Sequence, residues 1–170
     1  MGIISRFPAG ATEPYIEEIY NSDGQLIDAK MYGYENIRDS AFSGCSSLAL
    51  TSLPSGITNI GDYAFEGCSS LALTTLPSEI THIGTSAFSG CTSLALTTLP
   101  SGITNIDYRA FADCTSLVSL TFEGTPERID ITTFIGCNNL TTINVPWAEG
   151  AVANAPWGAT NATINYGHTG

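Results

Sequence analysis

"CSSLALTTLPSEITHIGTSAFSG", residues Cys68 to Gly90, is followed at once by "CTSLALTTLPSGITNIDYRAFAD", which repeats nearly the same text. Aligning the chain on its cysteines extends this 23-residue spacing over five units, and phenylalanine, leucine and isoleucine positions keep the same period. Strict register of apolar positions means that each unit makes the same turn and stacks on its neighbour, so the sequence predicts a solenoid. The cysteine and phenylalanine ladders are Cys45, Cys68, Cys91, Cys114 and Cys137, and Phe42, Phe65, Phe88, Phe111 and Phe134.

Each unit divides into a strand half and a turn half. The segment from Leu71 to Pro77 predicts a short strand that the proline ends, because proline cannot donate the next ladder hydrogen bond. Strands of successive units would lie side by side, about 4.8 Å apart, in a parallel sheet. The chain would then turn a corner at Ile80 and Ile83. A short helical or 3₁₀ segment would follow, place Phe88 in the core and end at Gly90.

The pattern C-x-x-L, then L-P, then I-x-x-I-G-x-x-A-F-x-G-C, over residues 37–146, resembles the BspA-like class of bacterial leucine-rich repeats. The resemblance implies an α/β solenoid, a right-handed leucine-rich repeat. Its parallel β-sheet would form the concave face, and short helical or 3₁₀ turns the convex face. It also implies a role in recognition or adhesion, often at bacterial surfaces.

The two ends of the repeat array are expected to be caps, since a solenoid leaves its end units half-covered. We divide the chain into an N-terminal cap with a β-hairpin (1–36), five 23-residue repeats (37–146) and a C-terminal cap and tail (147–170). The hairpin is predicted from two strand-like runs about the turn residues 21–24. In the tail, Trp147 and Trp157 are expected to cover the open core end, with carbohydrate stacking or partner anchoring as the alternative. A final strand is expected from Ala162 to Tyr166.

The strand half departs from the family's usual L-x-x-Φ-x-Φ-P pattern, where Φ is apolar, in the first three units. Thr51, Thr74 and Thr97 occupy the expected inward position, and a leucine stands one residue earlier in each unit. Either the strand bulges and turns these leucines inward, or it keeps register and displays them on the open face. We favour the inward alternative, because exposed stacked leucines are unfavourable without a ligand. The expected partner-binding set on the concave face covers both cases: Leu50, Ser52, Leu73, Thr75, Leu96, Thr98 and Thr121.

The charge of the chain argues against some partners. Asp and Glu outnumber Lys and Arg by 16 to 5, which gives a net charge of −11. Nucleic acids and anionic membranes would repel such a chain. No apolar run is long enough to span a bilayer, so we expect no membrane insertion. Seven acids crowd the first forty residues. We interpret them as a solvated face, with a cation or basic-partner site as the alternative: Glu13, Glu17, Glu18, Asp23, Asp28, Glu35 and Asp39.

The cysteines and histidines give no catalytic pattern. The 23-residue spacing of the cysteines matches no zinc or redox motif, so we expect buried, reduced thiols that fill space and donate weakly to a loop carbonyl. His82 stands in the slot that holds asparagine in sister units and is expected to be exposed, and His168 lies in the tail. No catalytic residues, metal site or cofactor is predicted, and we do not expect an enzyme.

Two functions remain open from the sequence. The first is a non-catalytic recognition or adhesion module that binds a protein or glycan partner. The second is a structural spacer in a larger surface or phage-tail-like assembly, where the chain would be an oligomer. The tail is similar to the endings of repeat proteins from gut-bacterial genomes and their prophages. Residues 1–14 lack the apolar core of a secretory signal, so we expect a chain that is intracellular, that is delivered by a route without a signal, or whose signal was removed. The sequence leaves the location open, and association with the cell surface or with a phage particle is the favoured expectation.

Overall fold

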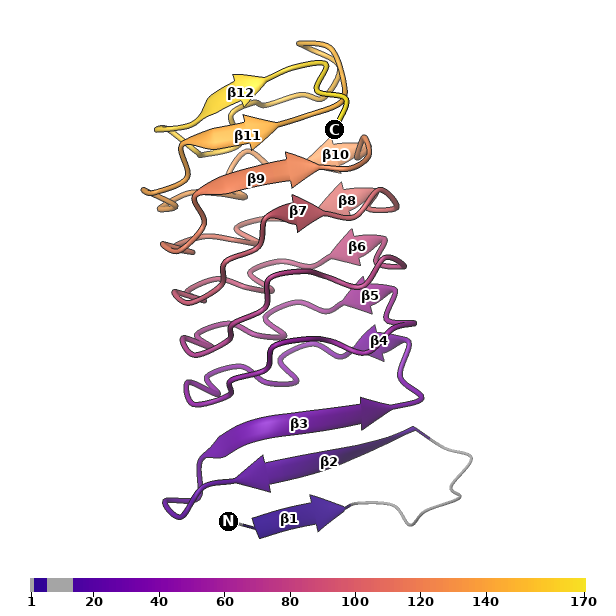
Figure 1. The fold of residues 1–170 in the computed structure, drawn as a ribbon, viewed down its shortest axis with the longest axis vertical. Helices are drawn as coiled ribbons and strands as arrows, with labels where there is room; N and C mark the ends of the chain where they lie inside the picture. Colours follow the sequence, from indigo (N-terminus) through magenta and orange to yellow (C-terminus); the bar gives the residue numbers. More distant parts are fainter. Residues whose placement is uncertain (1, 6–13) are drawn as a thin grey trace.

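Two parallel sheets share the turns of a solenoid in the computed structural model (Figure 1), which describes residues 2–5 and 14–170. The first sheet has the order β10-β8-β6-β5-β4, and the second has the order β12-β11-β9-β7. The first sheet contains β4 (Asn36–Ile37), β5 (Asn59–Ile60), β6 (His82–Ile83), β8 (Asn105–Ile106) and β10 (Arg128–Ile129). The second contains β7 (Thr98–Leu99), β9 (Ser119–Phe122), β11 (Thr142–Asn144) and β12 (Thr163–Asn165).

The second sheet is the one predicted from the strand half of each unit, but it is shorter than expected. It begins only at β7, and the matching segments of the first two units form no strand. In β9, Leu120 and Phe122 point inward in strict alternation. In the earlier units two consecutive residues, such as Thr74 and Thr75, both point outward. This doubled outward position interrupts the alternation that a regular strand requires.

The first sheet was not predicted as a sheet. The isoleucines of its two-residue strands are the positions at which we expected a corner, and they are buried. Each strand lies exactly one repeat from its neighbour, with Ile60 paired to Ile83 and Ile83 paired to Ile106. Because the period does not change, every corner falls beside the previous one and its backbone groups can pair in parallel.

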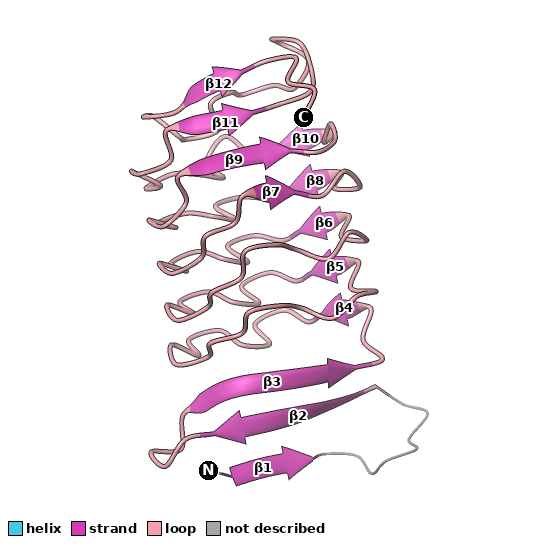
Figure 2. Cartoon of the chain, in the orientation of Figure 1, coloured by secondary structure: helices cyan, strands magenta, loops and turns pink. Residues whose placement is uncertain are grey.

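The prediction of short helical or 3₁₀ turns on the convex face was wrong. The described residues contain no helix (Figure 2), and therefore none that could cross a membrane. The amides of Ser86 and Phe88 instead donate to carbonyls of the next turn, at Tyr108 and Ala110, each at 2.8 Å. Only alternate amides, such as that of Ala87, bond within the turn. A helix would need all of these donors within its own segment, so stacking replaces it.

The core is a set of parallel columns. The five ladder phenylalanines stack with ring centroids 5.3–5.7 Å apart and ring planes within 13° of each other. Leucine and isoleucine columns, such as those of Leu71 and Ile83, run beside them and are fully buried. Each turn therefore buries its apolar residues mainly against the turns above and below, which is why the 23-residue register is kept.

The N-terminal hairpin has the predicted position. β2 (Tyr15–Tyr20) pairs antiparallel with β3 (Leu26–Tyr32), and β1 (Gly2–Ser5) adds an outer strand. The side chain of Asn21 holds the turn by accepting hydrogen bonds from the amides of Asp23 and Gln25. The amide of Ala49 donates to Ile27 at 3.0 Å and joins the hairpin to the first unit.

The C-terminal segment covers the other end of the core by making a shortened further turn. β12 pairs in parallel with β11, as the predicted final strand requires. Trp157 is fully buried and follows Phe134 by 23 residues, and the Phe134 amide donates to its carbonyl at 2.8 Å. Trp147 is 5% exposed and meets Phe122 edge-on. Both tryptophans thus lie in the core, as expected for a cover, and neither ring is available for carbohydrate stacking.

Candidate functional site

The outward side of the second sheet, together with the matching segments of the first two units, is called the front face here. Ser52 and Thr75 are exposed on it, and Thr98 and Thr121 are half-buried. Thr98 lies directly beside Thr121 in the register of β7 and β9. The structure therefore places the predicted hydroxyl-bearing residues in one row across successive turns.

The row continues further than the sequence reasoning predicted. The Nδ2 atom of Asn144 donates to Oγ1 of Thr121 at 3.1 Å, and Asn165 donates in the same way to Oδ1 of Asn144 at 2.8 Å. The signal was present in the sequence, because residues 142–144 and 163–165 both read TIN. It was missed because the spacing there is 21 residues instead of 23.

The three disputed leucines do not belong to the front face. Leu50, Leu73 and Leu96 are 4%, 0% and 2% exposed and form part of the core. The favoured inward alternative is therefore confirmed, and these leucines are removed from the expected contact set. The outward threonine that follows each of them takes the surface position instead.

A small pocket of about 180 Å³ opens on the front face between the first two units, where the sheet is interrupted. Its lining is rich in hydroxyl groups and carries one carboxylate. A hydrogen bond from the hydroxyl of Ser78 lowers the pKa of Glu79. The pocket therefore presents several donors and acceptors beside one anionic group. Its lining residues are Ser52, Leu53, Ser55, Thr75, Leu76, Pro77, Ser78 and Glu79.

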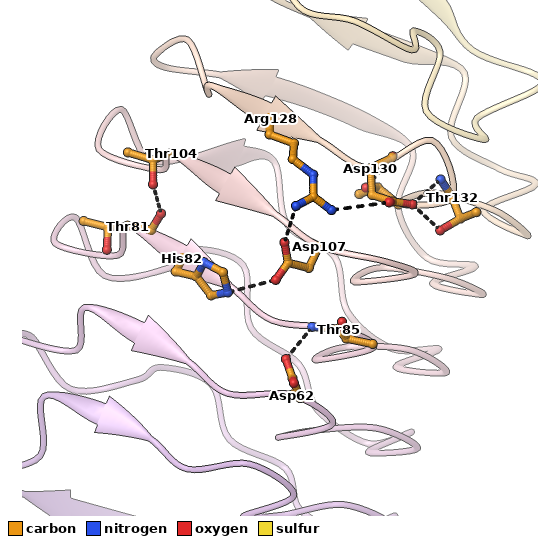
Figure 3. A network of polar contacts seen from close by, with 10 residues as sticks. Asp62, Thr81, His82, Thr85, Thr104, Asp107, Arg128, Asp130 and Thr132 are labelled. Carbon is orange, nitrogen blue, oxygen red and sulfur yellow. Dashed lines mark hydrogen bonds and ion pairs between the residues drawn. The ribbon is translucent and has the colours of Figure 1, made fainter.

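A second polar cluster lies over the first sheet (Figure 3). Nε2 of His82, on β6, lies 3.0 Å from Oδ2 of Asp107, which follows β8. Arg128, on β10, lies 3.8 Å from Asp107 and 3.7 Å from Asp130. His82 was expected to be exposed, but only 33% of its side chain is exposed, because the ring packs toward Asp107. These contacts tie three turns together, which is a structural role.

The cysteines have the predicted role in the core. The thiols of four of them donate to the phenylalanine carbonyl of the preceding turn at 2.9–3.1 Å. Burial raises the pKa of Cys68 and that of Cys137 to about 12. Protonated, enclosed thiols are poor nucleophiles and poor metal ligands. Within residues 2–5 and 14–170, no group of three or more His, Cys, Asp or Glu side chains is arranged to hold a metal ion.

Comparison with known proteins identifies the repeat. The family model of the BspA type leucine rich repeat region matches residues 32–150 with six copies. The chain belongs to the BspA-type leucine-rich repeat family. No curated protein sequence matches this BspA-type chain significantly.

A solved structure of a leucine-rich repeat protein has the same fold. A leucine-rich repeat protein from Bacteroides ovatus ATCC 8483 is similar over 84% of this chain, with 25% identity and a TM-score of 0.53. This BspA-type chain spans 45% of that protein's length. The T. pallidum leucine-rich repeat protein TpLRR is 25% identical over 75% of this chain and 80% of its own, with a TM-score of 0.49.

Proposed function

We propose that this chain is a non-catalytic recognition module that binds a protein or glycan partner on its front face. Leucine-rich repeat solenoids use extended faces of stacked turns for binding. The observation that carries the proposal is the row of outward hydroxyl groups at Ser52, Thr75, Thr98 and Thr121, which stands on a rigid, fully stacked core. The pocket beside Ser52 and Thr75 adds a recess in which a partner group could be held.

The chemistry of this surface favours a neutral, hydrogen-bonding partner. On the front face, the outward residues of the first three units have the small side chains of alanine, serine and threonine, for example Ala72, Thr74 and Thr75. Such a surface allows close approach of a flat partner, and each hydroxyl can both donate and accept. Glu79 gives the pocket one negative charge, so a strongly anionic glycan would be disfavoured.

The proposal is tested with a panel of immobilised neutral glycans and bacterial and host surface proteins. The double variant Thr75→Lys/Thr98→Lys should lose binding to any partner that the unmodified chain captures, because two long cations would cover the row. Thr92→Lys is the matched control, since Thr92 is exposed outside the front face. Equal affinity of all three proteins would contradict the site.

The same samples test the alternative of a structural spacer. A spacer in a larger assembly should form stable oligomers in sedimentation experiments and should bind nothing on the panel. A monomer that binds a panel member through the front face supports recognition instead.

A further inference from the structure

The two halves of the first three units have diverged to different degrees. At the turn edge, corresponding residues differ in size and charge, as in the set Tyr63, Ser86 and Arg109. On the front face, corresponding residues are nearly the same: Ala49, Ala72 and Ala95; Thr51, Thr74 and Thr97; and Ser52, Thr75 and Thr98. Duplication of one unit would leave both halves equally similar. The constancy of the front face therefore needs a reason of its own.

Contacts within the chain do not supply this reason. The hydroxyls of Ser52, Thr75 and Thr98 make no hydrogen bond to any described residue. By contrast, the hydroxyls of Thr81 and Thr104, beside the first sheet, donate to carbonyls of the preceding turn at 3.2 and 3.0 Å. Turn stacking thus explains the constant threonines beside the first sheet, whereas the constant hydroxyls of the front face are free to bond to another molecule.

The turns set the spacing of these free groups. Successive turns lie about 4.8 Å apart, the separation of paired strands. The first three units therefore offer the same methyl and hydroxyl groups three times at one interval. A ligand that uses all three sets equally must itself repeat at this interval. No charged residue occurs among the nine outward positions, which favours a neutral ligand.

The pocket between the first two units adds a recess to this array. Its volume of about 180 Å³ is below the about 300–1,000 Å³ of typical small-molecule sites, so it admits one sugar ring or a group of similar size. The amide of Thr75 donates to no described residue. The carboxylate of Glu79, which the hydroxyl of Ser78 holds, is an acceptor. Sugar hydroxyls match both groups, because each can donate and accept.

We propose that the front face binds a neutral, unbranched polysaccharide that lies along the solenoid axis with one sugar ring per turn. One ring enters the pocket beside Thr75 and Glu79, and the following ring bonds to Thr98 and packs against the methyl group of Ala95. An extended polysaccharide repeats the same hydroxyl groups at close to the turn spacing. This inference rests on the front-face function proposed above and names the class of its ligand.

Other occupants fit this face less well. A second copy of the chain also repeats at the turn spacing, but the outward side chains of its first three units are too small to fill the pocket. A folded protein with a surface that does not repeat would use the three sets of groups unequally. It would therefore give no reason for their constancy.

The test is isothermal titration calorimetry of the full chain with oligosaccharides of increasing length. The probes are the β-1,4-linked oligomers of glucose, of mannose and of N-acetylglucosamine, from one to six rings. In a series that binds, each added ring should raise the affinity about threefold to tenfold, because it adds hydrogen bonds to one more turn. The increase should stop when the rings outnumber the turns that carry the row.

Isosteric variants place the rings on the face. Thr75→Val should weaken binding of every oligomer about threefold to tenfold, because it removes a hydroxyl from the pocket. Thr98→Val should weaken the longer oligomers by a similar factor and leave the shortest oligomer that binds unchanged. Thr92→Val is the matched control, since Thr92 is exposed outside the front face, and it should bind all oligomers normally. Circular dichroism of each variant shows whether the fold is kept.

Three results would overturn the inference. An affinity that does not change with the number of rings would confine the ligand to the pocket. Capture of a protein through the front face, with no binding in any oligomer series, would keep the recognition function and reject the polysaccharide. Self-association that Thr75→Lys/Thr98→Lys abolishes would assign the face to a second copy. If neither the panel nor the oligomers bind through this face, the recognition function fails as well.

Discussion

Asp62 of one turn lies so close to Gly84 of the next that its Oδ1 atom would be 2.5 Å from a Cβ atom at Gly84. The same oxygen accepts a hydrogen bond from the amide of Thr85 at 2.8 Å. Asp39 and Gly61 repeat the arrangement one turn earlier. In the following turn Thr85 stands at the position of this aspartate. The residue 22 places after Thr85 is Asp107 instead of glycine. An aspartate thus stabilises the turn stack only if a glycine follows 22 residues later.

The first prediction concerns this glycine. Gly84→Ala should destabilise the chain by about 1–3 kcal/mol, the usual cost of overpacking a closed site. The backbone of Asp62 and Gly61 is also within 3.0 Å of the new atom, so side-chain movement alone would not relieve the clash. Urea unfolding of the variant measures the loss. Gly102→Ala is the control, because its nearest atom would be 3.5 Å away, and an equal loss in both variants would contradict the explanation.

The second prediction concerns the alkaline limit of stability. The pKa of Cys68 is raised to about 12 by burial, from an ordinary value of 9.0. Its contribution to stability is therefore complete below about pH 9 and is lost as pH rises toward 12. Over this range it should reduce the free energy of unfolding by about 1.4 kcal/mol per pH unit, because the unfolded chain releases the proton first.

Urea unfolding between pH 8.5 and 11 checks this slope. In Cys68→Ala the free energy of unfolding should fall less steeply with pH, by the contribution of one thiol. This variant should nevertheless be less stable than the unmodified chain at pH 8. Cys45→Ala is the comparison, since Cys45 is partly exposed and should change the slope less. An unchanged slope in Cys68→Ala would mean that the thiol ionises equally in the folded and unfolded chain.

The periodicity predicted the solenoid, its stacked core and the thiol contacts, because each depends on residues that recur at one spacing. The hairpin was predicted from the turn residues 21–24 instead. The first sheet and the absence of helices were not predictable in the same way. They depend on which amides bond to the next turn, and Ser86 at φ 51° shows a backbone conformation that apolar spacing does not reveal. The pair of His82 and Asp107 was missed because the two residues occupy different positions of the repeat.

The third prediction tests the register of the strand half. In the third unit Leu96 points inward and Thr97 outward, whereas in the fourth Ser119 points outward and Leu120 inward. Leu96→Ser alone should cost about 2–5 kcal/mol, because it removes a buried leucine. Leu96→Ser/Thr97→Leu should recover most of this loss by adopting the register of β9. Thermal unfolding of the single and double variants measures the recovery, and additive losses would contradict the shared register.

Recognition through the front face can be tested directly by hydrogen exchange. Hydrogen exchange measured by mass spectrometry, with and without a partner captured on the panel, reports which amides become protected on binding. We predict protection in the segments that contain Ser52, Thr75 and Thr98, and no change in β5, β6 and β8 on the other sheet. Protection confined to the other sheet, or none on the front face at saturating partner, would contradict recognition by the hydroxyl row.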